Sequence, residues 1–153
     1  MIDKSIHLID AVKDADTLVD ILSTGAVFPL VVTGSSMMPF LREGRDTVFL
    51  QKTNKVRRGR IVFFRRKSGE FTLHRIRKIF PDGRLLINGD AQNWCEMIAP
   101  EQVLAEVIAV KREGREIKQN GFFPSLLRLL WYPTRAFRPF IWRTYGAFRR
   151  IFK

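Results

Sequence analysis

Short runs of strand-forming residues fill the middle of the chain and limit its fold more than any other feature. Six runs rich in Val, Ile, Leu and Phe lie between residues 26 and 117. They read VFPLVVT, DTVFLQK, GRIVFFRR, EFTLHRIRKIF, RLLING and VLAEVIAVKR. Such residues favour strands, and the breaks REGR, KSGE and PDG between them favour tight turns. Their close spacing predicts a compact, mostly antiparallel β domain over residues 26–120.

The first 25 residues follow a helical period instead. The apolar side chains with this spacing are Leu8, Val12, Ala15, Leu18, Val19 and Leu22. Gly25 follows them as a candidate C-cap, so we predict a short amphipathic helix within residues 1–25 that packs on the β domain. Five aspartates interrupt the stretch, which therefore lacks the unbroken apolar core of a secretory signal peptide.

Composition narrows the classes of site and partner. Cys95 is the only cysteine, which excludes an internal disulfide and a multi-cysteine zinc site. The sequence contains no phosphate-binding glycine loop, and we expect neither a metal nor a cofactor. The net charge of +12 indicates that some face of the protein meets an anionic partner, either nucleic acid or a membrane surface.

Residues 121–153 form a tail of different character. They hold seven Arg or Lys and no acidic residue, mixed with aromatics and leucines. The longest apolar stretch is broken by Pro124 and Arg128 and stops at Pro133, short of the roughly 20 residues that span a bilayer. We expect amphipathic helices that lie at an anionic membrane interface. The residues expected at headgroup depth are Trp131, Tyr132, Trp142 and Tyr145.

Two other interpretations of the tail stay open. It could be a helix docked on the β domain, or an arm whose aromatic residues stack on nucleic-acid bases. The run LLRLLW favours contact with hydrocarbon over contact with bases, so nucleic acid is the less favoured partner. We expect peripheral membrane association through the tail, on the cytoplasmic face because the sequence shows no export signal.

Two segments hold residue types that serine hydrolases use. GSSMMP, residues 34–39, follows a predicted strand, and His74 lies on the predicted strand FTLHRIRKI. A hydroxyl becomes a useful nucleophile only when a base lies within hydrogen-bonding reach and donors await the oxyanion. Taken singly, GSSMMP is typical of a turn, and a lone histidine on a strand is typical of a structural residue.

In order along the chain, GSSMMPFL, GRIVFFRR, TLHRIRKI and INGDAQN resemble the successive boxes of the type I signal peptidase family. The resemblance, over about residues 27–110, implies a signal-peptidase or LexA-like β fold. It also implies a serine endopeptidase that removes leader or signal peptides from precursor proteins. Ser36 matches the nucleophile and His74 the base. Most bacterial members have a lysine at the base position, whereas a histidine there is similar to the endoplasmic-reticulum and archaeal subgroup, with its Ser-His mechanism.

The resemblance assigns roles around this pair. His74 would take the Ser36 proton as a neutral base with a pKa near the ordinary value of about 6.5. A carboxylate that orients the imidazole and stabilises its charged form would complete the site. Asp90, in INGDAQN, is the preferred candidate, and Glu96 is the alternative.

The chain departs from the family pattern at three positions. Arg60 follows Gly59 where an acid is common, and Ala91 stands where the last box usually has Asn. Gly34 occupies a position where some relatives have a hydroxyl residue that helps to bind the oxyanion. The backbone N–H of Ser36 would therefore do more of that work.

Substrate is expected to bind along two strand edges. The family binds its substrate as an extra strand, here between residues 30–33 and residues 71–73. The candidate substrate-binding residues are Val31, Val32, Leu73 and Met37, the last packed under the nucleophile. A catalytically silent peptide-binding module of the same fold and a basic nucleic-acid-binding protein are the alternative functions. The related LexA-type repressors use a lysine base and usually carry a DNA-binding domain, for which the first 25 residues leave no room.

Overall fold

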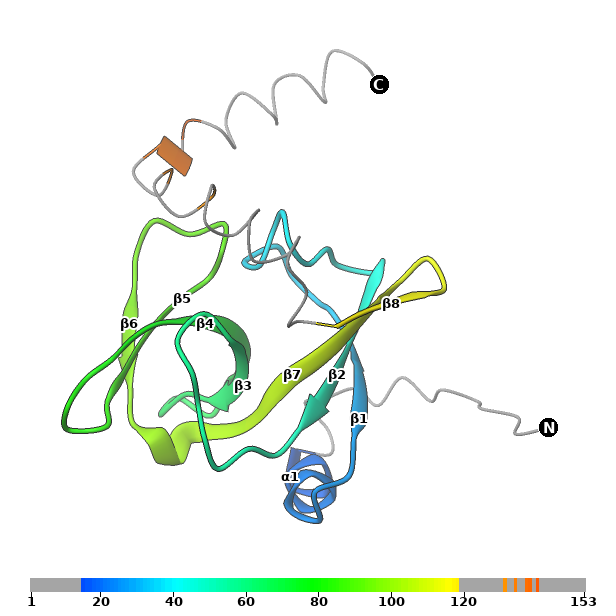
Figure 1. Ribbon diagram of the computed structural model, residues 1–153, viewed down its shortest axis with the longest axis horizontal. Coiled ribbons are helices and arrows are strands. Elements are labelled where there is room, and N and C mark those ends of the chain that lie inside the picture. The colour runs from blue at the N-terminus through cyan, green and yellow to red at the C-terminus, as the bar shows by residue number, and fades with distance from the viewer. Residues whose placement is uncertain (1–14, 119–130, 132–133, 135–136, 139, 141–153) are drawn as a thin grey trace.

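The structure of the protein is a computed structural model that describes residues 15–118 and, in the tail, residues 131, 134, 137, 138 and 140 (Figure 1). The elements are α1 (Ala15–Ser23), β1 (Phe28–Val31), β2 (Asp46–Gln51), β3 (Ile61–Arg65), β4 (Phe71–Ile79), β5 (Leu85–Asn88), β6 (Glu96–Ile98), the 3₁₀ turn η1 (Pro100–Gln102), β7 (Val103–Arg112) and β8 (Arg115–Lys118). The prediction of a mostly antiparallel β fold with a short N-terminal helix is confirmed.

All described strand pairs are antiparallel and join in the order β1-β2-β7-β3-β4-β5-β6, with β8 added to β7. Strand β7 connects the two halves of the sheet, β1, β2 and β8 on one side and β3 to β6 on the other. Its first part pairs with β3, and the rest pairs with β2 and β8. Figure 1 shows the resulting sheet to be strongly curved. Curvature of this kind follows from strand twist and from register shifts, which occur within the β2–β7, β3–β7 and β4–β5 pairs.

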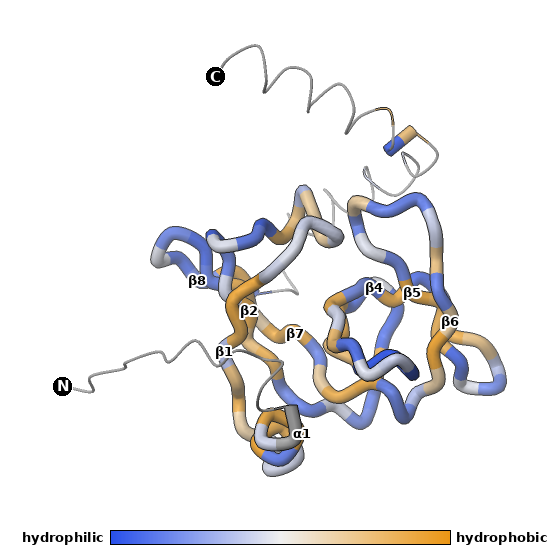
Figure 2. The backbone as a smooth tube through the Cα atoms, turned by 180° about the vertical axis from the view of Figure 1, so that it is seen from behind, coloured by the Kyte–Doolittle hydropathy of each residue, from blue (hydrophilic) through white to orange (hydrophobic). Residues whose placement is uncertain are grey.

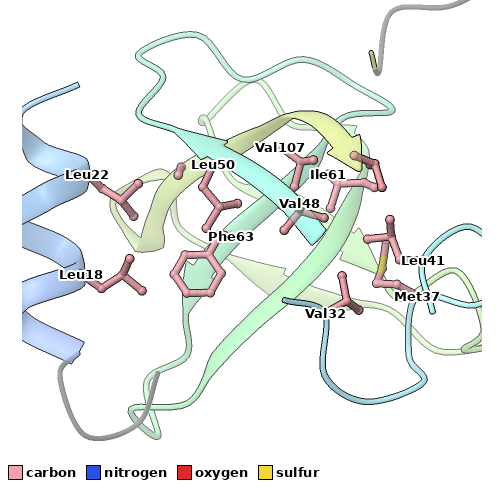
Figure 3. Close-up of a cluster of buried hydrophobic side chains, with 12 residues drawn as sticks. Leu18, Leu22, Val32, Met37, Leu41, Val48, Leu50, Ile61, Phe63 and Val107 are labelled. Carbon is pink, nitrogen blue, oxygen red and sulfur yellow. The ribbon is translucent and has the colours of Figure 1, made fainter. Parts of the chain in front are cut away.

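Two apolar clusters fill the two sides of the sheet. The first holds Leu18, Leu22, Val32, Met37, Leu41, Val48, Leu50, Ile61, Phe63, Ala105, Val107 and Val110 (Figure 3). The second holds Val62, Phe64, Ile76, Leu85, Ile87 and Ile98. Strand β3 contributes to both, because its successive side chains point to opposite faces and both faces are covered. The nucleophile motif enters the first cluster through Met37, which is 2% exposed.

The predicted N-terminal helix is present over Ala15–Ser23. Leu18 and Leu22, one helical turn apart, are buried on the first cluster. Gly25 takes a φ of +81° just after the helix, which agrees with the expected C-cap. Leu8 and Val12 lie outside the described residues.

The sequence analysis missed two strands. β6 is only three residues long, and every residue of β8 is exposed, so neither has an apolar run to mark it. Figure 2 shows the β8 hairpin as one of the more hydrophilic parts of the backbone. Its turn is built by Glu113 and Gly114, with φ of 49° and 79°, the two positive values that a tight hairpin turn requires.

Asp46 closes the loop that carries Ser36. Its carboxylate, fully buried, accepts hydrogen bonds from the Arg42 N–H (2.9 Å) and from the guanidinium groups of Arg45 and Arg112. Arg112 also donates to the Phe40 carbonyl in the same loop, at 2.7 Å. Burial opposes ionisation of Asp46, but these donors outweigh it and lower its pKa to about 2.

Asp46→Asn should lower the free energy of unfolding by about 2 kcal/mol at pH 7, because buried donors lose an ionised acceptor. The stabilisation by Asp46 is present above its unfolded pKa of about 3.9 and is lost as the pH falls towards 2. Urea unfolding at pH 7 and pH 3 measures both effects. Asp82→Asn, in an exposed pair with Arg84, is the matched control and should leave the midpoint unchanged. An Asp46→Asn protein as stable as the parent at pH 7 would contradict this role.

Candidate active site

Ser36 lies in the wall of an open pocket of about 560 Å³, lined by Gly34, Ser35, Ser36, Met38, Ala91 and Gln92. Gly34 has a φ of +74°, a conformation that suits glycine and turns the chain sharply before the serine. The buried Met37 side chain anchors the next residue in the core. Ser36 is therefore held at the rim of a pocket by a rigid attachment on one side and a tight turn on the other.

The turn of residues 88–92 supports the Ser36 loop. The Ala91 N–H donates to the Ser36 carbonyl at 2.9 Å. At Gly89 a Cβ atom would stand 2.7 Å from the same carbonyl and 2.6 Å from Gln92 Oε1. Only glycine permits this approach, so the Gly-Asp sequence that resembles a family box serves first to bring the turn against the nucleophile loop.

His74 is buried next to the carboxylate of Glu96. Its side chain is 1% exposed, and Nδ1 lies 2.9 Å from Glu96 Oε1. The two atoms are not aligned for a linear N–H···O bond, and Nδ1 has no well-directed acceptor. Glu96 is held in turn by Arg66, which donates from Nε at 2.9 Å and from Nη2 at 2.8 Å.

Two aromatic rings enclose the imidazole. Phe64 lies 5.9 Å away between ring centroids, and Trp94 meets the imidazole edge-on at 6.1 Å. Burial is the largest influence on His74 and lowers its pKa to about 4; Glu96 raises it and Arg66 lowers it further. The expected pKa near 6.5 is therefore wrong, because the imidazole is less hydrated than the sequence could show. His74 is neutral at pH 7, as a general base must be.

Glu96, not Asp90, is the acid beside His74. Asp90 is 1% exposed, and its carboxylate accepts two hydrogen bonds from the Arg75 guanidinium, from Nε at 2.9 Å and from Nη2 at 2.6 Å. Neighbouring residues on a strand point to opposite faces, so a group paired with Arg75 lies across β4 from His74. The preference for Asp90 as the orienting acid is thus at odds with the geometry, and the alternative residue occupies that place.

The structure attaches Ser36 and His74 to one segment, residues 88–96. Ser36 is bonded to the turn at its start, and His74 meets Trp94 and Glu96 at its end. In the described part of the chain Ser36 Oγ and His74 Nε2 do not hydrogen-bond each other. Catalytic hydrogen bonds in substrate-free enzymes are often long and tighten on binding.

The remaining predicted residues fall into two groups. Val32 and Met37 have buried side chains, so they present no side chain to a substrate. Val31 and Leu73 are half-buried, on β1 and β4. Arg60, at the position where the family often has an acid, pairs with Glu106.

Other contributing residues were not found from the sequence. They are Arg66, Arg75, Asn88, Trp94, Trp131 and Arg138. Of these residues, Arg75 could have been noticed in the sequence, because it directly follows the candidate base His74. Within the described residues no group of three or more His, Cys, Asp or Glu is placed to hold a metal ion, and no helix is long and apolar enough to cross a membrane.

The family model for peptidase S24-like proteins matches residues 5–112, which include α1, β1 to β7, Ser36 and His74. The chain belongs to the peptidase S24-like family. This family is of serine-peptidase type, with the LexA and signal-peptidase-like β fold. The matched range begins before residue 25, so it includes part of the predicted N-terminal helix. No curated protein and no solved structure matches the chain.

The imidazole of His74 should titrate near pH 4, which NMR of the ring protons can measure in a His7→Gln background that leaves one histidine. The unfolded chain binds more protons than the folded one between pH 6.5 and 4, so His74 makes stability fall as the pH drops through that window. His74→Gln should remove this part of the pH dependence. A midpoint near 6.5 in the folded protein would show that the imidazole is hydrated and would contradict the buried site.

Proposed function

We propose that the protein is a serine endopeptidase that cleaves leader or signal-type peptides from precursor proteins, with Ser36 as nucleophile, His74 as general base and Glu96 as the acid that orients it. One observation carries the proposal. The buried, neutral imidazole of His74 lies beside the ionised carboxylate of Glu96. Glu96 belongs to the segment of residues 88–96, which also supports Ser36, the serine that matches the family nucleophile, at the rim of a pocket.

The chemistry follows from these positions. His74 Nε2, which hydrogen-bonds to no described residue, takes the proton of Ser36 as the hydroxyl oxygen attacks the peptide carbonyl carbon. The Glu96 carboxylate stabilises the imidazolium, and the backbone N–H of Ser36 donates to the developing oxyanion. His74 then gives the proton to the leaving amine. Water repeats the sequence on the acyl-enzyme and releases Ser36.

Burial opposes ionisation of Glu96, but its ion pair with Arg66 and the neighbouring His74 outweigh burial and lower its pKa. Glu96 is therefore charged at neutral pH, as an acid that supports an imidazolium has to be. This arrangement distinguishes the site from a buried histidine in a merely apolar pocket.

Two strand edges support an extended substrate. Among the described strands, β1 pairs only with β2, and residues 71–73 of β4 pair only with β3. Their apolar side chains (Phe28, Leu30, Phe71 and Leu73) pack against the same core cluster. Edges of this kind can add a strand, so we propose that the peptide binds by main-chain hydrogen bonds along them. The family resemblance adds a preference for small residues next to the scissile bond.

We further propose that residues 121–153 hold the enzyme on an anionic membrane surface. Phe137 and Phe140 are 67% and 69% exposed, in a segment without acidic residues. Exposed aromatics beside basic residues fit a lipid interface. Trp131 differs from the expectation, because its indole N–H donates to the Asp90 carbonyl at 2.8 Å and its ring contacts the protein.

Ser36→Ala and His74→Ala should each abolish cleavage of a library of extended peptides. Mass spectrometry of the products measures this cleavage. Glu96→Gln should fold normally but lose about 10³–10⁴-fold in kcat, because the imidazolium loses its counter-charge. Asp90→Asn should mainly lower the melting temperature, since it leaves the buried Arg75 without its charged partner.

An acylating probe separates the enzyme from a silent peptide-binding module, because only an activated Ser36 gains the probe mass. Near-parent cleavage by Glu96→Gln would reduce the site to a Ser-His pair. Parent-level cleavage by Ser36→Ala would overturn the assignment.

The double variant Phe137→Ser/Phe140→Ser should bind phosphatidylglycerol vesicles at least about tenfold more weakly than the parent. The reason is that two exposed aromatic side chains no longer insert into the lipid. Added salt should weaken the parent in the same assay, since it screens the charge attraction. Phosphatidylcholine vesicles and duplex DNA are the comparison ligands, read by sedimentation. Preference for DNA over anionic vesicles would favour the nucleic-acid interpretation instead.

A further inference from the structure

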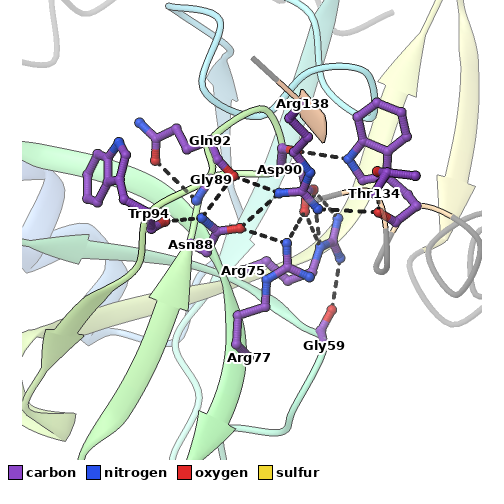
Figure 4. A network of polar contacts seen from close by, with 11 residues as sticks. Gly59, Arg75, Arg77, Asn88, Gly89, Asp90, Gln92, Trp94, Thr134 and Arg138 are labelled. Atoms are coloured by element: carbon purple, nitrogen blue, oxygen red, sulfur yellow. Dashed lines mark hydrogen bonds and ion pairs between the residues drawn. The ribbon is translucent and has the colours of Figure 1, made fainter. Parts of the chain in front are cut away.

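Residues of the C-terminal tail reach the turn that supports Ser36 (Figure 4). Trp131, Thr134 and Arg138 lie about 40 to 50 positions beyond this turn in the sequence, yet Trp131 and Arg138 bond to it directly. The family model ends at residue 112, so the turn lies within the matched range and its partners in the tail lie outside it.

Arg138 makes the deepest of these contacts. It is 0% exposed, and Nη1 donates to Asn88 Oδ1 at 3.1 Å and to the Gln92 carbonyl at 2.7 Å. Burying a guanidinium costs several kcal/mol unless its donors are satisfied. A tail that served only as a membrane anchor would have no need for such a residue. Arg138 clamps the two ends of the turn, residues 88 and 92.

Trp131 holds the middle of the turn. Its indole N–H donates to the Asp90 carbonyl at 2.8 Å. The ring also meets Phe40 edge-on, with centroids 6.4 Å apart, and Phe40 belongs to the loop that carries Ser36. Arg138 stacks over the same indole at 5.5 Å. Trp131 thus contacts both the supporting turn and the nucleophile loop.

The turn lies between the tail and the nucleophile. Its carbonyls at residues 90 and 92 accept hydrogen bonds from Trp131 and Arg138, while the Ala91 N–H and the bare Gly89 backbone face Ser36. The Asn88 side-chain amide also donates to the Trp94 carbonyl, and the Trp94 ring covers His74. A shift of the turn would consequently displace the nucleophile and the cover of the base together.

We propose that Arg138 and Trp131 are positioning residues of the active site, which fix the turn of residues 88–92 and through it the placement of Ser36. The catalytic role of that placement rests on the proposed function. The tail is then an integral part of the peptidase.

The test uses full-length Arg138→Met, Arg138→Lys, Arg138→Ala and Trp131→Phe proteins, with Ile117→Ala on the exposed strand β8 as the control. Arg138→Lys keeps the charge but cannot bridge residues 88 and 92 with a planar fork. Trp131→Phe removes the indole N–H and keeps an aromatic ring. Amide hydrogen exchange at Ala91, protected by the Ser36 carbonyl, reports the turn without any need for catalysis.

In the Arg138 variants the Ala91 amide should exchange at least about tenfold faster, and kcat should fall about 10–100-fold with KM changed less than about threefold. Trp131→Phe should speed Ala91 exchange and lower kcat, each by about three- to tenfold. Added guanidinium at low millimolar concentration should restore part of the kcat of Arg138→Ala. Ile117→Ala should match the parent in exchange and in kcat.

Unchanged Ala91 exchange and kcat in Arg138→Met would overturn the inference. If Arg138→Met fails to fold, Trp131→Phe decides by the same two readouts. A parent protein that neither cleaves peptides nor reacts at Ser36 would refute the proposed function. In that case faster Ala91 exchange in the variants would still establish the clamp on the turn.

Discussion

The buried ion pair between Arg75 and Asp90 is the contact on which the site depends. Arg75 pairs in register with Asn88, the last residue of β5, so its guanidinium meets the turn that follows. His74, one residue earlier, points to the other face and enters the apolar cluster beside Phe64. Strand alternation therefore gives two adjacent residues two separate tasks, and a register slip of one residue would exchange them.

Three arginines around the turn of residues 88–92 are internal. Arg75, Arg77 and Arg138 are 5%, 6% and 0% exposed and lie around the same turn. Arg75 and Arg77 share the Asp90 carboxylate, whereas Arg138 donates to the Asn88 side chain and the Gln92 carbonyl. Arg112 is likewise committed to Asp46. Among the described residues, the buried acids Asp46, Asp90 and Glu106 match these three buried arginines, so burial leaves the net charge of +12 undiminished. One of the seven basic residues of the tail is nevertheless buried.

The parts that the sequence predicts are those with a local signal. Alternation in DTVFLQK, the helical spacing of Leu18 and Leu22 and the glycine at residue 25 each follow from neighbouring residues. The choice of acid beside His74 did not follow from neighbouring residues. Asp90 and Glu96 lie close together in the sequence, and they differ in which residue of β4 they pair with, Arg75 for Asp90 and His74 for Glu96. The contact of Arg138 with Asn88 has no periodic signal, since it joins positions 50 residues apart. The lowered pKa of His74 depends on how completely Phe64 and Trp94 cover it, which is a property of packing.

If His74 acts as the base, as proposed, its burial explains why Glu96 matters. A lysine at this position, as most bacterial type I signal peptidases have, would have to lose its proton from an ordinary pKa of about 10.4, and burial is the means to that end. The same burial lowers the pKa of a histidine, and here the pKa of His74 is about 4 even with Glu96 beside it. Glu96 opposes the effect of burial by favouring the imidazolium, while Arg66 keeps Glu96 ionised and itself lowers the His74 pKa. In the proposed mechanism a buried histidine therefore benefits from a carboxylate held beside it, and the Arg66-Glu96-His74 arrangement provides one.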